Sequence, residues 1–332
     1  MHLATNSFPP LIDRFGRQIN YLRISVTDRC DLRCKYCIPV GFTDYEEPKE
    51  WLTFTEIERV VRAFSSLGVE SFRITGGEPL LRKNLPKLIS QLSILEGVRD
   101  ISLSTNGTQL TKYAKKLKDA GLNRINVSMD STNAERFHEI CGRNALGQAL
   151  DGLQAAKKVG LGPIKINTVF MPDTTLEEVE ALVEYCKQEQ FVLRLIEVMP
   201  VGDTGRQVGQ SNINNIKKHL QSKFNLVNSI EKGPGPAKYL ASSDSLLKIG
   251  FITPMSQHFC ESCNRVRMSV DGILYLCLGQ NDNFDLKPYL RNEVSDDELL
   301  NAIREAILLK PEKHEFNERP EKIIRIMART GG

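Results

Sequence analysis

Short apolar runs alternate with longer amphipathic stretches along the first 200 residues of the chain. The apolar runs are rich in β-branched residues and predict strands at Tyr21–Val26, Phe72–Thr75, Ile101–Ser104, Arg124–Ser128, Ile164–Phe170 and Val192–Glu197. Between them, apolar residues recur about every 3.6 positions and predict helices at Thr55–Leu67, Leu85–Leu95, Thr111–Ala120, Ala145–Val159 and Leu176–Gln188. Strand–helix units in series predict an α/β fold in which helices cover a parallel sheet. Their common handedness curls the sheet into a partial (βα)6 TIM-like barrel.

Unusual residues follow the predicted strands, at the edge where parallel barrels carry their chemistry. They are Thr27-Asp28-Arg29-Cys30, Gly76-Gly77-Glu78-Pro79, Thr105-Asn106-Gly107, Met129-Asp130 and Met199-Pro200. Each segment alone is typical of a turn. Because all of them meet at one edge, we expect them to form a common site.

The alternation breaks at about Val201, where polar and glycine-rich sequence begins. We therefore expect two units. Residues 1–200 form the barrel with an N-terminal extension, and residues 201–332 form a module laid against its open side. This module carries the second of two cysteine groups and ends on Gly331-Gly332. A chain of 332 residues is long for a single core, which agrees with this division.

Composition narrows the class of protein. Hydrophobic residues make up 41% and charged residues 26%, as in ordinary globular proteins, and the net charge of +3 is too small to indicate nucleic acid or an anionic membrane as partner. No apolar run reaches the roughly 20 residues that span a bilayer. Residues 1–10 lack the basic and apolar regions of a signal peptide, so we expect a cytoplasmic protein.

Cysteine usage then indicates chemistry, because stable disulfides are rare in the cytoplasm. Six of the eight cysteines fall into two tight groups. Cys141 and Cys186 stand apart, and we interpret them as small core or surface residues.

Cys30, Cys34 and Cys37 form the first group, with the spacing C-x3-C-x2-C and Tyr36 before the last cysteine. Three thiolates hold three corners of a 4Fe–4S cluster and leave the fourth iron open. An open iron binds the amino and carboxylate groups of S-adenosylmethionine (SAM), whose one-electron cleavage yields a 5′-deoxyadenosyl radical. A structural zinc site is disfavoured, because it closes with four ligands and no fourth Cys or His lies nearby.

The second group, Cys260, Cys263 and Cys277, again supplies three thiolates. Two interpretations stay open from these residues alone. One is a zinc site completed by His258, and the other is a second 4Fe–4S cluster with an iron open to substrate.

Five basic residues are candidates for binding an anion. Arg265 and Arg267 alternate between the cysteines of the second group and would share one face of an extended segment. Arg23, Arg73 and Lys165 each lie two residues before a polar residue on a predicted strand and are expected to point into the barrel. A buried cation needs an anionic partner. That partner is either a structural Asp or Glu or a bound triphosphate.

The spacing C-x3-C-x-Y-C after the first strand, followed by the GGEP segment, resembles the radical SAM superfamily, which uses a partial (βα)6 barrel. The resemblance implies contacts with SAM at Tyr36, Gly77, Glu78, Ser128 and Met199. Ser128 also fits ordinary backbone bonding, and Met199 also fits ordinary packing.

The wider set of motifs resembles the GTP 3′,8-cyclase family from about Phe15 to the C-terminus. These motifs are C-x3-C-x2-C, GGEP, STNG, C-x2-C-x13-C, R-x-R and the final Gly-Gly. The resemblance implies two 4Fe–4S clusters and SAM as cofactors. It implies that a 5′-deoxyadenosyl radical takes hydrogen from ribose C3′ of GTP and that the carbon radical attacks guanine C8. The product is (8S)-3′,8-cyclo-7,8-dihydroguanosine 5′-triphosphate, the first intermediate of molybdenum cofactor biosynthesis.

The same resemblance assigns roles to individual residues. It implies that guanine approaches the second cluster and that GTP meets Arg23, Arg73, Ser104, Lys165, Arg265 and Arg267. It implies direct roles in catalysis for Arg265, Arg267, Gly331 and Gly332. The tail departs from the family at Thr330, where relatives commonly have an aliphatic residue.

Partners follow from the same resemblance, which implies an external one-electron donor and a cyclic pyranopterin monophosphate synthase that receives the product, and which admits a homodimer. Two rival functions stay open. A peptide-modifying radical SAM enzyme is disfavoured because its C-terminal segment usually holds more cysteines. A zinc-stabilised module for nucleic acid is disfavoured by the weak net charge and the lack of an aromatic–basic stripe.

Overall fold

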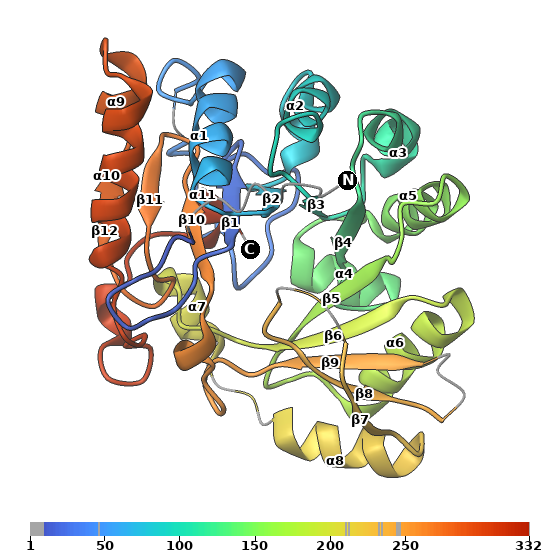
Figure 1. Cartoon of the computed structure of the whole chain (residues 1–332). Coiled ribbons are helices and arrows are strands. Elements are labelled where there is room, and N and C mark those ends of the chain that lie inside the picture. The colour runs from blue at the N-terminus through green and yellow to red at the C-terminus, as the bar shows by residue number, and fades with distance from the viewer. Residues whose placement is uncertain are drawn as a thin grey trace, which may run out of the picture.

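The structure is a computed structural model that describes residues 10–45, 47–209, 211, 213–231, 233, 235–243 and 247–331. Gly332, the last residue of the predicted tail, lies outside the described residues. Within these ranges, twelve strands form one sheet in the order β12-β11-β10-β1-β2-β3-β4-β5-β6-β9-β8-β7. The sheet curls, and helices follow one another round its outer face (Figure 1).

The six predicted strands are present as the central strands of this sheet, parallel to one another and in chain order. They are β1 (Tyr21–Ser25), β2 (Ser71–Thr75), β3 (Asp100–Thr105), β4 (Arg124–Ser128), β5 (Lys165–Phe170) and β6 (Val192–Glu197). The helices between them are α1 (Phe54–Ser66), α2 (Leu85–Ser93), α3 (Leu110–Asp119), α4 (Ala134–Cys141), α5 (Leu146–Lys158) and α6 (Leu176–Glu189). The predicted partial (βα)6 barrel is therefore confirmed.

Helix α1 illustrates how local sequence produces these units. The side chain of Thr53 accepts a hydrogen bond from the backbone N–H of Glu56, and the Glu56 carboxylate accepts one from the N–H of Thr53. This capping box satisfies donors that the first helical turn leaves free. Ile57, Val60 and Phe64 lie on one face and are fully buried. Burial of each such side chain contributes about 1.5–3 kcal/mol, which holds the helix in the core.

Residues 201–331 extend the sheet at both of its edges. Beside β1 lies β10, which is parallel to it, followed by the antiparallel strands β11 and β12. Beside β6 lies β9, also parallel, followed by the antiparallel strands β8 and β7. The bounds are β7 (Val227–Ser229), β8 (Lys238–Ala241), β9 (Lys248–Ile252), β10 (Arg265–Met268), β11 (Ile273–Tyr275) and β12 (Asn283–Asp285). The two expected units thus share one sheet, and a boundary near residue 200 stays a proposal.

The helices of this C-terminal part are α7 (Gly202–Val208), α8 (Ile213–Lys223), α9 (Lys287–Arg291), α10 (Asp296–Leu308) and α11 (Met327–Thr330). Helix α11 packs against β1 and lies inside the curl of the sheet (Figure 1). None of the described helices is long and apolar enough to cross a bilayer.

Packing between α3 and α5 depends on a glycine. A Cβ on Gly152 would lie 2.2 Å from the carbonyl oxygen of Gly107, whereas a Cβ on Gly147, in the same helix, would meet nothing within 4 Å. We predict that Gly152→Ala destabilises the chain by about 1–3 kcal/mol through overpacking. Gly147→Ala should instead add about 0.5–1 kcal/mol, because alanine loses less entropy on folding. Free energies of unfolding from denaturant titration test this, and equal effects would contradict the tight contact.

Candidate active site

The loop after β1 carries the first cysteine group and is clamped against the loop after β2. The N–H groups of Gly77 and Glu78 donate to the carbonyls of Thr27 and Arg29, both at 2.8 Å. A Cβ on Gly77 would lie only 2.4 Å from the carbonyl oxygen of Arg29. Glycine alone permits this approach. The GGEP segment therefore positions Cys30 through backbone contacts.

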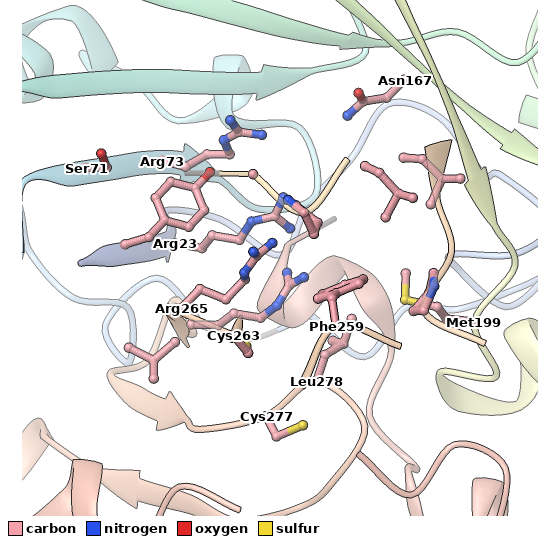
Figure 2. Close-up of a pocket in the computed structure, with 18 of the residues that line it drawn as sticks. Arg23, Ser71, Arg73, Asn167, Met199, Phe259, Cys263, Arg265, Cys277 and Leu278 are labelled. Atoms are coloured by element: carbon pink, nitrogen blue, oxygen red, sulfur yellow. The ribbon is translucent and has the colours of Figure 1, made fainter. Parts of the chain in front are cut away.

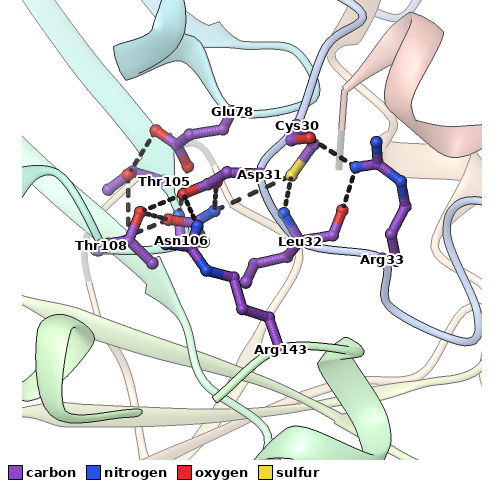
Figure 3. A network of polar contacts seen from close by, with 10 residues as sticks. Cys30, Asp31, Leu32, Arg33, Glu78, Thr105, Asn106, Thr108 and Arg143 are labelled. Carbon is purple, nitrogen blue, oxygen red and sulfur yellow. Dashed lines mark hydrogen bonds and ion pairs between the residues drawn. The ribbon is translucent and has the colours of Figure 1, made fainter. Parts of the chain in front are cut away.

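Glu78 joins the loop after β2 to the loop after β3. Its buried carboxylate accepts hydrogen bonds from the N–H of Leu80 at 3.0 Å, the N–H of Asn106 at 2.7 Å and the hydroxyl of Thr105 at 2.8 Å (Figure 3). Burial raises the pKa of Glu78 to about 7, against the opposing effect of these donors. Since the carboxylate already has three partners, its expected contact with SAM stays a prediction.

Asp31 ties the cysteine loop to the same turn. The amide of Asn106 donates to one carboxylate oxygen at 2.7 Å, and the hydroxyl of Thr108 donates to the other at 2.8 Å (Figure 3). Arg143 completes the network at 3.2 Å. The sequence analysis missed Asp31, although a carboxylate directly after the first cysteine was a usable signal.

The middle cysteine of the first group lies against the end of α4. The N–H groups on either side of Cys34, those of Arg33 and Lys35, donate to the carbonyls of Cys141 at 2.8 Å and Ile140 at 3.0 Å. The side chains of Cys34 and Cys141 are hydrogen-bonded to each other. Cys141 was interpreted as a core or surface residue, and it is buried in the core. It also contacts Cys34, an expected cluster ligand.

Tyr36 fixes the third part of this loop. Its hydroxyl donates to Asp130 at 2.7 Å, and the other oxygen of Asp130 accepts from the N–H of Val169 at 2.8 Å. Burial raises the pKa of Asp130 to about 6, while both hydrogen bonds oppose the rise. Ser128, at the end of β4, is exposed. Met199 lines a cavity, and like Cys37 it packs against the small apolar cluster that includes Val201 and Met327. SAM contacts at these residues stay predictions.

The second cysteine group lines this cavity, whose volume of about 520 Å³ is typical of a small-molecule site. Cys260 and Cys263 come just before β10, and Cys277 follows β11. Because β10 and β11 pair as antiparallel neighbours, they bring the three thiols together. His258, the candidate fourth ligand for zinc, is exposed, and its ring centre lies 6.2 Å from that of His314.

The donor chemistry of both groups suits iron–sulfur clusters, which are held by cysteine thiolates. In the first group burial raises the pKa of Cys30 and Cys37. In the second, burial also opposes ionisation of Cys263, but Lys310 and Arg265 outweigh it and lower its pKa. Among the described residues no three His, Cys, Asp or Glu side chains are arranged to hold a single metal ion. The assignment of iron–sulfur clusters therefore rests on the three thiols in each of the two cysteine groups.

Sheet register brings the predicted cations together. Arg23 on β1 is the register partner of Arg267 on β10 and of Arg73 on β2. Neighbouring strands lie about 4.8 Å apart, so these three arginines stand side by side on one face. Arg265 lies two residues before Arg267 on β10, in register with Tyr21, and lines the same cavity. Figure 2 shows Arg23, Arg73 and Arg265 projecting toward a common space.

Two of these cations have neutral partners, whereas the buried Nε of Arg23 has no hydrogen-bond partner among the described residues. The Nε of Arg73 donates to the hydroxyl of Ser102 at 3.1 Å, and Arg267 donates to the carbonyl of Gly331. Across the described part of the chain, no ion pair involves Arg23, Arg73, Lys165, Arg194 or Arg267. The predicted alternative of a structural carboxylate therefore finds no support among the described residues.

The two carboxylates that line the cavity within the described ranges have partners of their own. Asp100 accepts from Arg124 at 2.9 Å, and Glu231 pairs with Lys248 at 2.8 Å. The sequence analysis missed Arg194, which donates to the hydroxyl of Tyr239 at 2.6 and 2.8 Å. An arginine in the middle of an apolar strand was the signal that could have found it.

Burial and, after it, nearby arginines shift the pKa values of residues in the cavity wall. Burial, followed by nearby arginines, lowers the pKa of Lys165 to about 7 and that of Arg73 to about 9. Burial would raise the pKa of Tyr21, but the surrounding arginines outweigh it and lower the pKa to about 8. A bound anion would relieve this repulsion, so the cavity is prepared for a polyanionic ligand.

Ser104 is not among the residues that line this cavity, although strand register aligns it with Asn126 and, one strand further, with Lys165. It sits half-buried near the carboxyl end of β3, and its hydroxyl has no hydrogen-bond partner among the described residues. Its expected role toward GTP stays a prediction.

The C-terminal tail lies between the two cysteine groups. The N–H of Ala328 bonds to the sulfur of Cys37, and Arg325 donates to the carbonyl of Cys277 at 3.0 Å. Gly331 has φ +72°, and a Cβ there would lie 2.2 Å from a side-chain carbon of Thr75. Thr330 is fully buried, and its hydroxyl has no partner within the described chain. The tail therefore occupies the barrel interior, while its catalytic role stays a prediction.

Fold and cysteine loop together define the class as radical SAM proteins, and comparison with known proteins agrees. The profile of the Radical SAM superfamily matches residues 24–186, and the profile called Molybdenum Cofactor Synthesis C matches residues 191–316. The crystal structure of Streptococcus suis SuiB bound to S-adenosylmethionine has a similar fold, with a TM-score of 0.65, 14% identity, and coverage of 88% of this chain and 69% of that one.

Relatives of known name specify the family. GTP 3′,8-cyclase of Marinobacter nauticus is 42% identical over 97% of this chain and 98% of its own length. The GTP 3′,8-cyclase of Brucella ovis is 43% identical over 97% of this chain and 96% of its own length. That of Hydrogenovibrio crunogenus is 43% identical over 97% of this chain and 99% of its own length. The chain belongs to the GTP 3′,8-cyclase family. This decides against a peptide-modifying enzyme and a zinc-stabilised nucleic-acid module.

The seating of Gly331 generates a prediction. Gly331→Ala places a methyl group against Thr75 at a backbone angle that side chains rarely adopt. We expect displacement of the tail, intact iron content, and loss of most cyclised product. Iron analysis, SAM cleavage and product should be measured in parallel. Gly160→Ala is the matched control, because Gly160 has φ +70° with open space around it. Full product formation by Gly331→Ala would contradict a role for the tail.

Proposed function

We propose that the cavity of this chain is where it cyclises GTP, joining ribose C3′ to guanine C8 in the first step of molybdenum cofactor biosynthesis. One observation carries the assignment of the cavity. Arg267, Arg23 and Arg73 stand side by side in register without a carboxylate partner among the described residues. A triphosphate supplies the missing charge, and guanidinium groups match its oxygens.

Two 4Fe–4S clusters and SAM are the cofactors. Cys30, Cys34 and Cys37 would hold the first cluster, and SAM would bind beside it. The second cluster would be held by Cys260, Cys263 and Cys277. When bound, the first cluster and SAM supply a 5′-deoxyadenosyl radical that takes hydrogen from ribose C3′.

The residues of the chain provide position and charge for this chemistry. The row of arginines and Lys165 would bind the triphosphate at one level of the barrel. The second cysteine group lies on the wall of the same cavity, which would bring guanine beside the second cluster. The tail closes the space between this cavity and the first group, where Arg267 and Thr75 hold Gly331. It would thereby exclude water from a radical reaction.

Partners and location extend the proposal. Radical SAM chemistry needs an external one-electron donor, and a cyclic pyranopterin monophosphate synthase would receive the product. We place the enzyme in the cytoplasm, where thiols stay reduced. A homodimer is part of the proposal that solution scattering can test.

Separation of the two clusters tests the function directly. Anaerobic enzyme is incubated with SAM, reductant and each nucleoside triphosphate, and products are analysed by mass. Cys34→Ala should abolish 5′-deoxyadenosine formation. Cys263→Ser should lose about four irons and all cyclised product, while some uncoupled SAM cleavage persists. Cys186→Ala, which changes a buried cysteine of α6, should retain both clusters. Loss of zinc from Cys263→Ser, or product from another nucleotide, would refute the assignment.

The lowered pKa of Lys165 generates a second test. Burial and the neighbouring Arg194, Arg124 and Arg73 favour the neutral amine above about pH 7, with Glu231 opposing them weakly. A triphosphate favours the protonated amine. GTP binding at pH 8 should therefore take up a proton, and affinity should fall as pH rises from about 7. Calorimetry of the cluster-loaded enzyme without SAM, in buffers of different ionisation enthalpy, measures this uptake.

Two variants complete that test. Lys165→Met should weaken GTP binding about ten- to a hundredfold and abolish its share of proton uptake. Guanosine, which lacks phosphates, should bind both proteins alike. Lys158→Met removes the same charge from the exposed face of α5 and should change neither ligand. Equal losses for GTP and guanosine would contradict phosphate binding at Lys165.

A further inference from the structure

Lys310 is a buried cation that the mechanism above does not use. It follows the C-terminal end of α10, and only 1% of its surface is exposed. Its ammonium group donates to the carbonyl of Arg265 at 3.1 Å and to the carbonyl of Leu276 at 2.5 Å. Both acceptors are neutral, so they satisfy hydrogen bonds without balancing the charge.

The two acceptors belong to the segments that carry the second cysteine group. Arg265 comes two residues after Cys263, and Leu276 directly precedes Cys277. Lys310 therefore joins the two segments that must keep the three thiols together. It also lines the same cavity as these cysteines.

The charge of Lys310 has no counterpart on the described part of the chain. No ion pair joins it to a described carboxylate, and the other charged side chains that act on Cys263 together with it, Arg265 and Arg17, are themselves cations. Arg17 differs because Asp13 accepts from it at 2.6 Å. Burial of an unpaired charge is costly, so a partner is expected in the working enzyme.

The ammonium has room for such a partner. It carries three N–H donors, and the described residues accept from two of them. Lys310 acts electrostatically on Cys260, Cys263 and Cys277 alike. Thiolates that hold a cluster carry the negative charge that neutral thiols lack.

We propose that Lys310 is a positioning residue that supplies the counter-charge for the cluster held by Cys260, Cys263 and Cys277, and that it thereby raises the reduction potential of that cluster. The proposal rests on the proposed assignment of these cysteines to the second cluster. Reduction adds negative charge, so a nearby fixed cation stabilises the reduced form. For the same reason, Lys310 should stabilise the folded protein more when the cluster is bound than when it is absent.

Lys310→Met tests this proposal, because methionine keeps the unbranched side chain to within one atom of its length and removes the charge. The Cys34→Ala background leaves the second cluster as the only redox signal. Spectroscopic titration should show a reduction potential shifted to a more negative value. Lys313→Met is the matched control. It removes the same charge three residues away, where Lys313 is exposed and paired with Glu318 at 3.0 Å. That variant should leave the potential unchanged.

Thermal unfolding separates a charge effect from a scaffold effect. Lys310→Met should lower the melting temperature more in cluster-loaded protein than in cluster-free protein, because only the loaded protein presents all three thiolates. If Lys310→Met selectively loses the second cluster while the cluster-free protein still folds, that loss also supports the proposal. Lys310→Arg, which keeps the charge, should restore part of the potential.

Three results would overturn the proposal. An unchanged reduction potential in Lys310→Met would show that Lys310 is not the counter-charge of the cluster. Equal destabilisation of loaded and cluster-free protein would leave Lys310 a scaffold residue, as would failure of the cluster-free variant to fold. Iron and zinc analysis of the unmodified protein distinguishes these failures from failure of the proposed function: zinc bound by the second cysteine group would refute the cluster assignment itself.

Discussion

Repulsion among the cations inside the curled sheet is the constraint on which the rest of the structure depends. Parallel register leaves Arg267, Arg23 and Arg73 no freedom to move apart, because each is anchored on a neighbouring strand. Neutral groups accept hydrogen bonds from Arg73 and Arg267 but do not balance their charge. The folded chain tolerates this because its apolar side chains form one extended core between the sheet and the outer helices. Stability comes from the outer face of the sheet, and the inner face is left for the substrate.

The same inner face explains why the C-terminal part of the chain belongs to the site. Strand β10 pairs with β1 and brings Arg265 and Arg267 beside the arginines of the barrel, and the β10–β11 pair assembles the second cysteine group on the same wall. The tail then returns into the barrel and contacts Cys37 at one end of the interior and the carbonyl of Cys277 at the other. One continuous sheet thus sets the distance between two cysteine groups that lie more than 200 residues apart in sequence.

Loop contacts hold the first cysteine group in shape. Backbone pairing of GGEP with the loop after β1 holds Cys30, and the Asp31 network holds the segment that follows it. Tyr36 and the end of α4 hold the remaining cysteines. Because these contacts involve backbone groups and buried carboxylates, the loop is pre-organised, which lowers the entropy lost on binding a cofactor.

The sequence by itself determined the strand–helix alternation, the two cysteine groups and the family, because local periodicity and the spacing of rare residues are written along the chain. It also indicated that Arg23, Arg73 and Lys165 face inward, since strand alternation is local. It could not show that Cys141 meets Cys34, or that Lys310 joins the two segments that carry the second cysteine group. Those relations depend on register and on where helices end in space. Tertiary structure decided them, because whether a buried charge has a partner depends on all the residues that folding brings near it.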